Sequence, residues 1–532
     1  KDFDPTRPVH YEGAQGQPGH PLYQPLKRSS KVVFTSEMQK VEKTKTPPTS
    51  LPAISYKRDN PTDPEYVDII SRMYPRIEKL EGMALDPNHD RPIYMCEYAH
   101  SMGNSTGSMK EYWDLIRKYP QYQGGFIWDF VDQGLAQYEA DGKVSFYYGG
   151  DYNNYDATDN SFNNNGFIAA DRTPQAQAYE VRRQYQSIWT SPVDLTSGKI
   201  EVYNENFFIG LDNYALVWEL MQDGVVTKAG RVESLDVAPQ QKKQIALGYT
   251  SEDICPNAKE VLLNVSYTLK SKEPLLDIGY AVAEQQLTIR EYDTKAAFAM
   301  KESTRPIKIT KFEKSTDVEG YDWLISFDRQ GFINKIVYGQ MSIIEEHSSL
   351  RPNFWRAPTE NDLGAKLHNR FAAWRNPAMS FKKLEYNIED GLAVLKASYE
   401  MPTVKAKMVI TYTINGEGEI KVSQAMTTEK GANVSGMFRY GMRVELPAAY
   451  NTLEYYGRGE VENYSDRKSC ADIGIFKQSV AEQYNEKYVR PQESGTRSDL
   501  RYYEVKNSAG AGIRIIAENA FSASAIPYSI EQ

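Results

Sequence analysis

Residues 91–104 read Arg91-Pro-Ile-Tyr-Met-Cys-Glu-Tyr-Ala-His-Ser-Met-Gly-Asn104. Ile93 to Cys96 form a continuous apolar run, which is typical of a parallel strand that is covered on both faces. Glu97 comes at the carboxyl end of this run, and a turn of small residues follows it. In a (β/α)8 barrel the carboxyl ends of the strands surround the active site. The stretch therefore predicts a barrel strand that presents a catalytic carboxylate.

The residues that follow predict a helix and a second parallel strand. Ser108-Met-Lys-Glu111 has the spacing of a capping box, and Pro120 marks the end of the helix. A second apolar run, Phe126 to Val131, comes after two glycines. Strand, helix and strand together have the length of a βαβ unit, whose strands are parallel. The predicted helix carries four apolar residues on one face: Met109, Tyr112, Trp113 and Ile116.

The chain divides into three zones that differ in their pattern of strand-like and helical segments. Residues 1–188 alternate strand-like and helical stretches, which indicates an α/β domain. Residues 189–291 and 292–532 contain alternating strands and few helical patterns, which indicates two β-sandwich domains. The first zone has four candidate parallel strands, too few to close an eight-stranded barrel: Val9–Gly13, Val67–Tyr74, Ile93–Glu97 and Phe126–Val131.

Two tight turns support the β-rich zones. Leu216–Gln222 is joined by Asp223-Gly224 to a further strand-like run, and Lys407–Ile414 is followed by Asn415-Gly416 and another such run. Asp-Gly and Asn-Gly pairs supply the backbone conformations that hairpins need, so both segments predict β-hairpins. Residues 14–66 differ, being rich in Pro, Lys, Ser, Thr and Gln. We expect a surface excursion there, with a functional lid as the alternative.

The composition of the chain argues against some classes of binding partner. The 532 residues carry a formal net charge of -9, which argues against nucleic acid or anionic lipid as the main partner. We see no run of about eighteen apolar residues that would predict a membrane span. Cys96, Cys255 and Cys470 lack CxxC spacing and are expected to be buried thiols rather than disulfides or zinc ligands. The chain starts at Lys1 without a Met, so we expect a piece of a longer protein and leave the compartment, cytoplasm or periplasm, open.

Several segments resemble one known family. Residues 96–104, together with Gln123-Gly-Gly-Phe-Ile-Trp-Asp-Phe-Val-Asp-Gln133, resemble the large β-galactosidases of glycoside hydrolase family two. Four later segments resemble family segments in the same order: residues 165–174, 356–364, 457–467 and 488–497. The resemblance implies the second half of a TIM barrel (1–188), an immunoglobulin-like β-sandwich (189–291) and a large β-sandwich like the β-galactosidase small chain (292–532). The last domain is expected to be cut short.

The resemblance also implies roles for individual residues. Glu97 takes the role of the catalytic nucleophile, and Tyr74 that of the tyrosine that hydrogen-bonds it. His100 matches a histidine that contacts galactose hydroxyls, and Trp128 the tryptophan beneath the sugar. Without the resemblance, a lone Glu after a strand is more often structural, and His100 and Trp128 also fit ordinary structural roles.

Ion binding follows from the same resemblance. Asn165 matches an asparagine that reaches both the sugar and a monovalent cation, Na⁺ or K⁺, and Phe162 would lend its backbone carbonyl to that ion. Taken alone, residues 163–165 predict a polar loop. The Mg²⁺ ligands and the acid/base glutamate belong upstream of Lys1, and Glu12 is not expected to replace that glutamate.

Residues 356–364 resemble a family loop at the rim of the active site, in which Gly364 would allow a hinge-like bend. A plain β-turn is the alternative. Glu360 stands where the family has an aspartate.

The resemblance thus implies part of a retaining exo-β-galactosidase acting on terminal β-D-galactosides, and a homo-oligomer is left open. The chain alone should be nearly inactive, because losing general acid catalysis costs about two to four decades of rate. β-Glucuronidases and β-mannosidases share the architecture and are the first alternative. The second is a non-catalytic carbohydrate-binding remnant.

Overall fold

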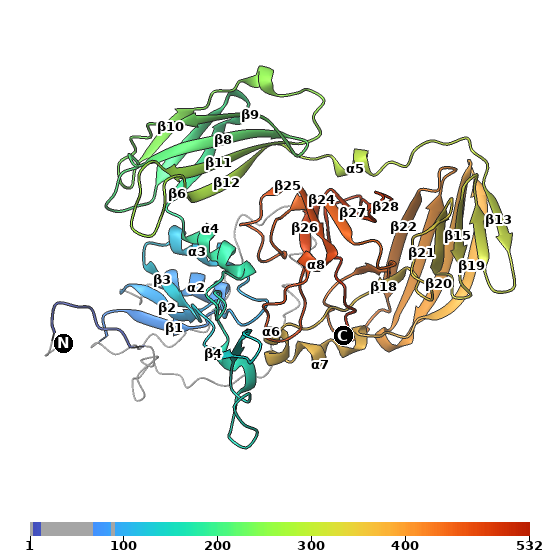
Figure 1. The fold of residues 1–532 in the computed structure, drawn as a ribbon, viewed down its shortest axis with the longest axis horizontal. Coiled ribbons are helices and arrows are strands. Elements are labelled where there is room, and N and C mark those ends of the chain that lie inside the picture. The colour runs from blue at the N-terminus through green and yellow to red at the C-terminus, as the bar shows by residue number, and fades with distance from the viewer. Residues whose placement is uncertain (1–3, 12–66, 87–90, 532) are drawn as a thin grey trace.

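The computed structural model describes residues 4–11, 67–86 and 91–531. Figure 1 shows three bodies in sequence order: a small α/β body, a β-sandwich above it, and a large β-rich body on the right that runs to the C-terminus. Predictions for residues 12–66, including the surface excursion and the exclusion of Glu12, lie outside the described residues.

The α/β body contains a parallel sheet in the order β1-β2-β3, flanked by helices. Its core joins strand residues Ile70, Ile93 and Met95 to Leu80 and Met109 from two of the helices. The elements are β1 (Ile70–Met73), α2 (Ile77–Ala84), β2 (Ile93–Tyr98), α3 (Met109–Lys118), β3 (Tyr122–Ile127), β4 (Leu135–Tyr138), β5 (Val144–Tyr147), the 3₁₀ helix η1 (Asn160–Asn163) and α4 (Ala176–Tyr185).

The predicted strand, helix and parallel strand are confirmed, with β2 reaching Tyr98. The position of the second strand was wrong, because β3 starts at Tyr122 and ends at Ile127 and so includes both glycines. Gly125 lies against Met95, where an added Cβ would be 3.0 Å from the Met95 Cβ and carbonyl oxygen. Gly125 therefore allows close strand packing, whereas Gly124 has open space around it.

Three other predictions in this body were wrong or only partly right. Ser108 adopts a left-handed conformation and makes no side-chain cap, because its backbone N–H is held by the Asp466 carbonyl at 2.7 Å. Val9 to Tyr11, the described part of the first predicted strand, form no strand, although the Val9 carbonyl accepts a hydrogen bond from the Asp68 N–H. Of residues 67–74, only Ile70–Met73 form β1.

The second body is a β-sandwich whose two sheets have the strand orders β10-β7-β6 and β12-β11-β8-β9. Its core brings Ile200 and Val202 of one sheet against Leu216, Trp218 and Leu263 of the other. The predicted hairpin is confirmed, since β8 and β9 are joined by Asp223 and Gly224, both at positive φ. The strands are β6 (Ile188–Asp194), β7 (Lys199–Asn204), β8 (Tyr214–Gln222), β9 (Val225–Val232), β10 (Lys242–Ala246), β11 (Val261–Leu269) and β12 (Ala281–Arg290).

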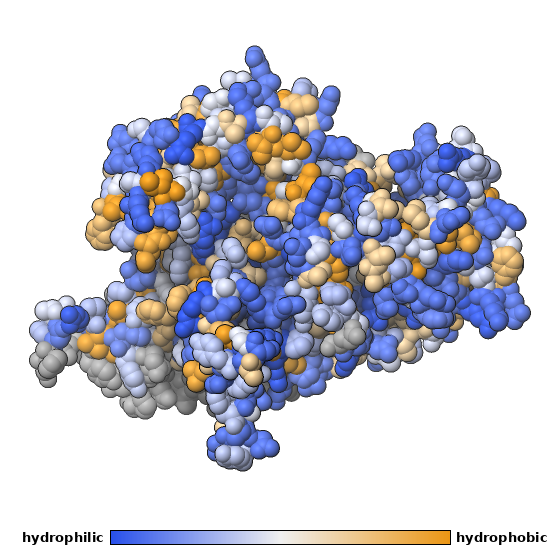
Figure 2. Space-filling view, in the orientation of Figure 1, coloured by the Kyte–Doolittle hydropathy of each residue, from blue (hydrophilic) through white to orange (hydrophobic). Residues whose placement is uncertain are grey.

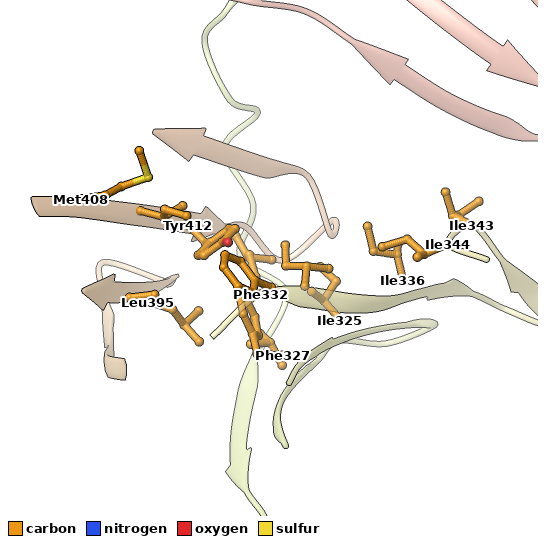
Figure 3. Close-up of a cluster of buried hydrophobic side chains, with 14 of the residues drawn as sticks. Ile325, Phe327, Phe332, Ile336, Ile343, Ile344, Leu395, Met408 and Tyr412 are labelled. Atoms are coloured by element: carbon orange, nitrogen blue, oxygen red, sulfur yellow. The ribbon is translucent and has the colours of Figure 1, made fainter. Parts of the chain in front are cut away.

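The last body begins with a five-stranded sheet, ordered β13-β14-β15-β16-β17, that packs against a four-stranded sheet, β19-β20-β21-β22. Figure 3 shows the side chains that fill the space between them, with Phe327 of β15 near Tyr412 of β21, their ring centroids 5.0 Å apart. The Asn-Gly hairpin is confirmed by β21 and β22. A third sheet, β25-β24-β27-β28, adds Tyr455 and Tyr503 to the same core.

The elements between the second body and the C-terminus are α5 (Thr294–Ala297), β13 (Lys308–Lys311), β14 (Thr316–Glu319), β15 (Trp323–Phe327), β16 (Ile333–Tyr338), β17 (Met341–Ser342), β18 (Arg351–Asn353), α6 (Glu360–Gly364), α7 (Leu367–Arg370), β19 (Ser380–Glu389), β20 (Leu392–Met401), β21 (Ala406–Ile414), β22 (Ile420–Thr428), β23 (Gly441–Arg443), β24 (Thr452–Arg458), β25 (Ile473–Ser479), α8 (Val480–Gln483), β26 (Arg497–Leu500), β27 (Tyr502–Lys506), β28 (Gly512–Ile515) and β29 (Phe521–Ala523).

Buried polar contacts tie the last body to the other two. Arg501 forms an ion pair with Glu260 of the second body, and Tyr456 also hydrogen-bonds to Glu260. Arg183 of α4 donates to Asp472 at 2.9 Å. Each contact satisfies a charge that the packed interface would otherwise leave unpaired.

All three cysteines are free. Cys96 is buried as predicted, Cys470 is partly buried, and Cys255 is exposed, so the prediction of a buried thiol was wrong there. Figure 2 shows hydrophobic residues only in small groups on the visible face. Among the residues with described structure, no helix has the length and apolar character needed to span a membrane.

The turn between β8 and β9 gives a test of packing against the last body. Gly224 has φ 82°, and an added Cβ would lie 2.6 Å from Cγ1 of Ile475. Gly279 in the same sandwich has φ 84° with open space around it. We expect Gly279→Ala to lower the free energy of unfolding by about 1 kcal/mol through backbone strain, and Gly224→Ala by about 1–3 kcal/mol more. Calorimetry of the two variants measures the difference, and equal losses would contradict the contact.

Candidate active site

The predicted site residues gather at the carboxyl ends of β1, β2 and β3. Tyr74 directly follows β1, Glu97 is the penultimate residue of β2, and Trp128 directly follows β3. The Tyr74 N–H donates to the Glu97 carbonyl at 2.7 Å, and the Trp128 N–H donates to the Tyr98 carbonyl at 3.2 Å. Parallel pairing therefore brings these three residues to one edge of the sheet.

Glu97 and Tyr74 form the centre of this edge. Tyr74 has φ 45° and is 40% exposed, and the Glu97 side chain is partly buried beside it. Burial raises the pKa of the Tyr74 phenol well above its ordinary value, and hydrogen bonding to the Glu97 carboxylate and its negative charge raise it further. The phenol therefore stays protonated at ordinary pH and can donate to the carboxylate.

His100 lies two residues beyond the end of β2, between two aromatic rings. Its ring centroid is 6.0 Å from that of Tyr74 and 5.9 Å from that of Phe162, with which it is stacked at 28°. The His100 Nδ1 is 2.8 Å from the Oδ1 of Asn361, which belongs to the last body. The imidazole is thus held by residues from three separate segments.

Phe162 of η1 and Asn165 of the loop that follows it lie next to each other at this site. Asn165 is 1% exposed, and its Nδ2 donates to the Phe162 carbonyl. Within the part of the chain that the structure describes, the buried Oδ1 of Asn165 has no hydrogen-bond partner. A buried oxygen without a partner next to a backbone carbonyl has the chemistry that a hard monovalent cation prefers. Phe162 and Asn165 therefore fit part of such a site.

Asp132 holds this loop in place. Its Oδ1 accepts from the Gly166 N–H at 2.8 Å and its Oδ2 accepts from Nε2 of Gln175 at 2.9 Å. The Asp129 N–H also donates to the Asn165 carbonyl at 2.8 Å. A Cβ at Gly166 would lie 2.2 Å from the Asp132 nitrogen, so only glycine fits this close approach.

Trp128 joins the site through its backbone. Its carbonyl accepts from the Ser101 N–H at 2.8 Å, and its peptide bond to Asp129 is cis. The indole is 37% exposed and makes no ring contact with Tyr74, His100 or Phe162 among the described aromatic pairs. Its ring is therefore open to solvent at this edge.

The structure links five of the six predicted residues by successive contacts, from Glu97 through Tyr74, His100 and Phe162 to Asn165. Trp128 lies at the same edge of the sheet and is held there by backbone hydrogen bonds to Tyr98 and Ser101. Sequence reasoning assigned no contact to three residues that support them: Asp132, Glu360 and Asn361. All three lie inside the segments that carry the family resemblance, but no local pattern pairs a residue near position 100 with one near position 360. Gly364 ends α6 without a left-handed backbone and has open space around it, and the hinge-like bend expected there stays a prediction.

A cleft of about 3070 Å³ lies between the α/β body and the last body. Tyr74, His100 and Asn361 line it, whereas Glu97, Trp128, Phe162 and Asn165 do not. Ligand pockets usually have volumes of roughly 300–1,000 Å³, so this space is a groove between bodies rather than one sugar pocket. Within the described residues no group of three or more His, Cys, Asp or Glu side chains could hold a metal.

Three family models match the chain in sequence order. They are the TIM barrel domain of glycosyl hydrolases family 2 at residues 1–190, domain 4 of β-galactosidase at residues 200–290, and the β-galactosidase small chain at residues 319–532.

Curated relatives agree with these models. A β-galactosidase of Priestia megaterium is 34% identical over 466 residues, covering 87% of this chain and 44% of the relative. One of Clostridium acetobutylicum is 35% identical over 413 residues, covering 76% of this chain and 44% of the relative. The chain spans about half the length of the curated relatives it matches. A solved exo-chitosanase, CsxA of Amycolatopsis orientalis, aligns at 9% identity and a TM-score of 0.18 over 66% of this chain and 29% of its own, too weakly to describe the fold.

The partial barrel and the β-sandwich bodies that follow it agree in order with these models and relatives. The chain belongs to glycosyl hydrolase family 2.

We expect Asp132 to make the stability of the Asn165 loop depend on pH. Burial raises the pKa of Asp132 from 3.8 to about 6, with the charges of Glu360 and Asp129 adding to the effect. Because the folded-state pKa is the higher one, protonation favours the ordered loop, and its stability falls as the pH rises from about 4 to about 6. We expect Asp132→Asn to remove this dependence, worth about 2 kcal/mol.

Hydrogen exchange of the Gly166 and Phe167 amides, corrected for intrinsic exchange rates, measures this effect at pH 4 and pH 7. Asp141→Asn, on an exposed turn, is the control and should behave as the wild type. The same pH dependence in Asp132→Asn would show that another group causes it.

Proposed function

We propose that this chain is the part of a retaining exo-β-galactosidase that carries the nucleophile, and that Glu97 is this nucleophile. The observation that supports it most is the position of Glu97 near the carboxyl end of the middle strand of a parallel sheet, with Tyr74 beside it. The curated relatives named β-galactosidase support galactose as the sugar.

In the proposed first step the Glu97 carboxylate attacks the anomeric carbon of a terminal β-galactoside. The glycosidic C–O bond breaks, and its electron pair goes to the leaving oxygen, which takes a proton from an acid in the remainder of the barrel. A galactosyl ester of Glu97 results. In the second step water gives a proton to the conjugate base and attacks the same carbon, which frees β-galactose and the carboxylate.

Each neighbouring residue has a separate proposed task. The protonated Tyr74 phenol stabilises the Glu97 charge before attack. His100 binds sugar hydroxyls from the wall formed by Phe162 and Tyr74, and the exposed Trp128 indole offers an apolar face to the sugar ring. The acid/base glutamate and the Mg²⁺ ligands are proposed to come from other residues of the complete barrel, so the chain alone should be nearly inactive.

We also propose that a Na⁺ or K⁺ ion takes oxygens from Phe162 and Asn165. The buried, unpartnered Oδ1 of Asn165 supports this, because an amide oxygen of this kind normally has a partner. Bound there, the ion would supply a positive charge beside the sugar.

The proposed division is a half barrel at 1–188, an immunoglobulin-like sandwich at 189–291 and a large sandwich at 292–532. Three-stranded and four-stranded antiparallel sheets in the second body support the immunoglobulin-like assignment.

A fluorinated galactoside with a dinitrophenyl leaving group tests the nucleophile. Such a leaving group needs no general acid, and fluorine slows hydrolysis of the ester. We expect the complete gene product to gain one fluorogalactosyl group, located on Glu97 by peptide mass spectrometry. Glu97→Gln should lose this label and at least about 10³-fold in kcat/KM. Glu111→Gln, on α3, is the control, and a label on another carboxylate would refute the assignment.

Thermal unfolding in NaCl, KCl and choline chloride at equal ionic strength tests the ion site. An ion that binds only the folded state at 100 times its Kd adds about 2.7 kcal/mol of stability. We expect Na⁺ or K⁺ to raise Tm relative to choline, and Asn165→Ala to abolish the difference. Asn163→Ala should keep it. An equal response of wild type and Asn165→Ala would place the ion elsewhere.

A further inference from the structure

We infer that Asn361, from the last body, fixes the tautomer of His100 and thereby determines which kind of sugar group this histidine recognises. The part concerning the sugar rests on the proposed function, whereas the tautomer does not. Asn361 is a positioning residue, because it acts on the ligand through His100.

Two contacts join the residues. The Asn361 Oδ1 lies 2.8 Å from the His100 Nδ1, and the Asn361 Nδ2 donates to the His100 carbonyl at 3.3 Å. A carbonyl oxygen can only accept, so the amide atom facing it must be the nitrogen. The opposite orientation of the amide would place two acceptors together. The orientation of Asn361 is therefore determined by the His100 backbone.

This orientation decides the position of the imidazole proton. The Asn361 Oδ1 is an acceptor, so Nδ1 of a neutral His100 must carry the hydrogen. Nε2 then keeps its lone pair. No hydrogen bond to Nε2 is found among the described residues, and His100 lines the cleft. Neutral His100 can consequently accept a hydrogen bond from a ligand hydroxyl but cannot donate one through Nε2.

The side chain of Asn361 is held firmly enough to determine which nitrogen of His100 carries the hydrogen. Asn361 is the second residue of α6, whose first turn is closed by a capping box between Thr359 and Asp362. Arg356 adds an ion pair to Asp362 with a 2.7 Å contact. A buried turn with both ends satisfied has few alternative conformations, so the position of the Asn361 side chain is set before any ligand binds.

Glu360 connects the same turn to both sides of the cleft. Its carboxylate accepts from Ser161 Oγ of η1 at 2.6 Å and from Nε2 of Gln492 at 3.4 Å. Ser161 directly precedes Phe162, which stacks on His100. Both the ring of His100 and the amide that orients it are therefore anchored through one buried turn. Figure 1 shows α6 between the barrel strands and the sheets of the last body.

With a lone pair on Nε2, neutral His100 favours ligand groups that donate a hydrogen bond. A group that only accepts, such as fluorine, cannot replace a hydroxyl that donates to Nε2. Sites built to hydrogen-bond a hydroxyl reject analogues that lack it, because the buried partner is left unpaired.

Nitrogen NMR of the [¹⁵N]histidine-labelled 532-residue chain tests the tautomer. At pH 9, above the ordinary pKa range of imidazole, the ring-carbon correlations distinguish protonated from unprotonated nitrogen. The signal is assigned by its loss in His100→Gln. We expect a protonated Nδ1 and an unprotonated Nε2 in the wild type. A protonated Nε2 overturns the inference.

Variants show whether Asn361 is the cause. Asn361→Ala should shift His100 toward the Nε2–H tautomer, which free imidazole side chains prefer. Asn361→Asp keeps an acceptor at Nδ1 and should keep the wild-type signal. Asn369→Ala, on the exposed face of α7, should also leave it unchanged. An unaltered tautomer in folded Asn361→Ala overturns the inference.

Adding galactose distinguishes a failure of this inference from a failure of the proposed function. Added to the complete gene product, galactose should change the His100 Nε2 signal. If the tautomer is as inferred but no concentration of galactose changes that signal, the proposed sugar site fails while the role of Asn361 stands.

Discussion

The site depends on the pairing of three parallel strands. β1 and β2 pair in register until Met73 meets Glu97, and β2 pairs with β3 up to Tyr98 and Ile127. Backbone hydrogen bonds between neighbouring strands thus decide where the side chains that follow can lie. A shift of one residue in β2 would turn Glu97 toward the opposite side of the sheet and replace it at this edge with a neighbour.

Residues of the barrel segment alone do not fix the side chains at the carboxyl ends of β1, β2 and β3. The turn after β2 contacts the last body through Asn104, whose Oδ1 accepts from Arg467 at 2.9 Å and whose Nδ2 donates to Tyr464 at 2.8 Å. Asn361 and Glu360 reach the neighbouring residues. Contacts between residues 199 to 363 positions apart in the chain therefore fix one histidine and one loop. The last body therefore supports side chains at the carboxyl edge of the barrel sheet.

Local patterns predicted the elements that local forces decide. The run at 93–96 predicted β2, because a buried strand has a sequence signature. The Asp-Gly pair predicted its hairpin through the left-handed backbone of Asp223 and Gly224. The hairpin after Asn415 formed as predicted, although its left-handed residue is Gly418. The cap at Ser108 failed because a backbone contact from Asp466 outweighs the local motif. The bounds of β3 failed because Gly125 packs against Met95, and turn propensity says nothing of such a contact. The family resemblance indicated the six site residues, but Asn361 required the tertiary structure.

The buried pair of Glu260 and Arg501 has a consequence for how this chain can change over evolutionary time. Both side chains are almost inaccessible to solvent, and Tyr456 shares the same carboxylate. Removing either charged side chain leaves the other charge buried and unpaired, which typically costs about 3–5 kcal/mol of folding stability. Replacement of the two by a well-packed apolar pair is far cheaper. Natural variation at positions 260 and 501 should therefore be correlated, with both charges retained or both exchanged together.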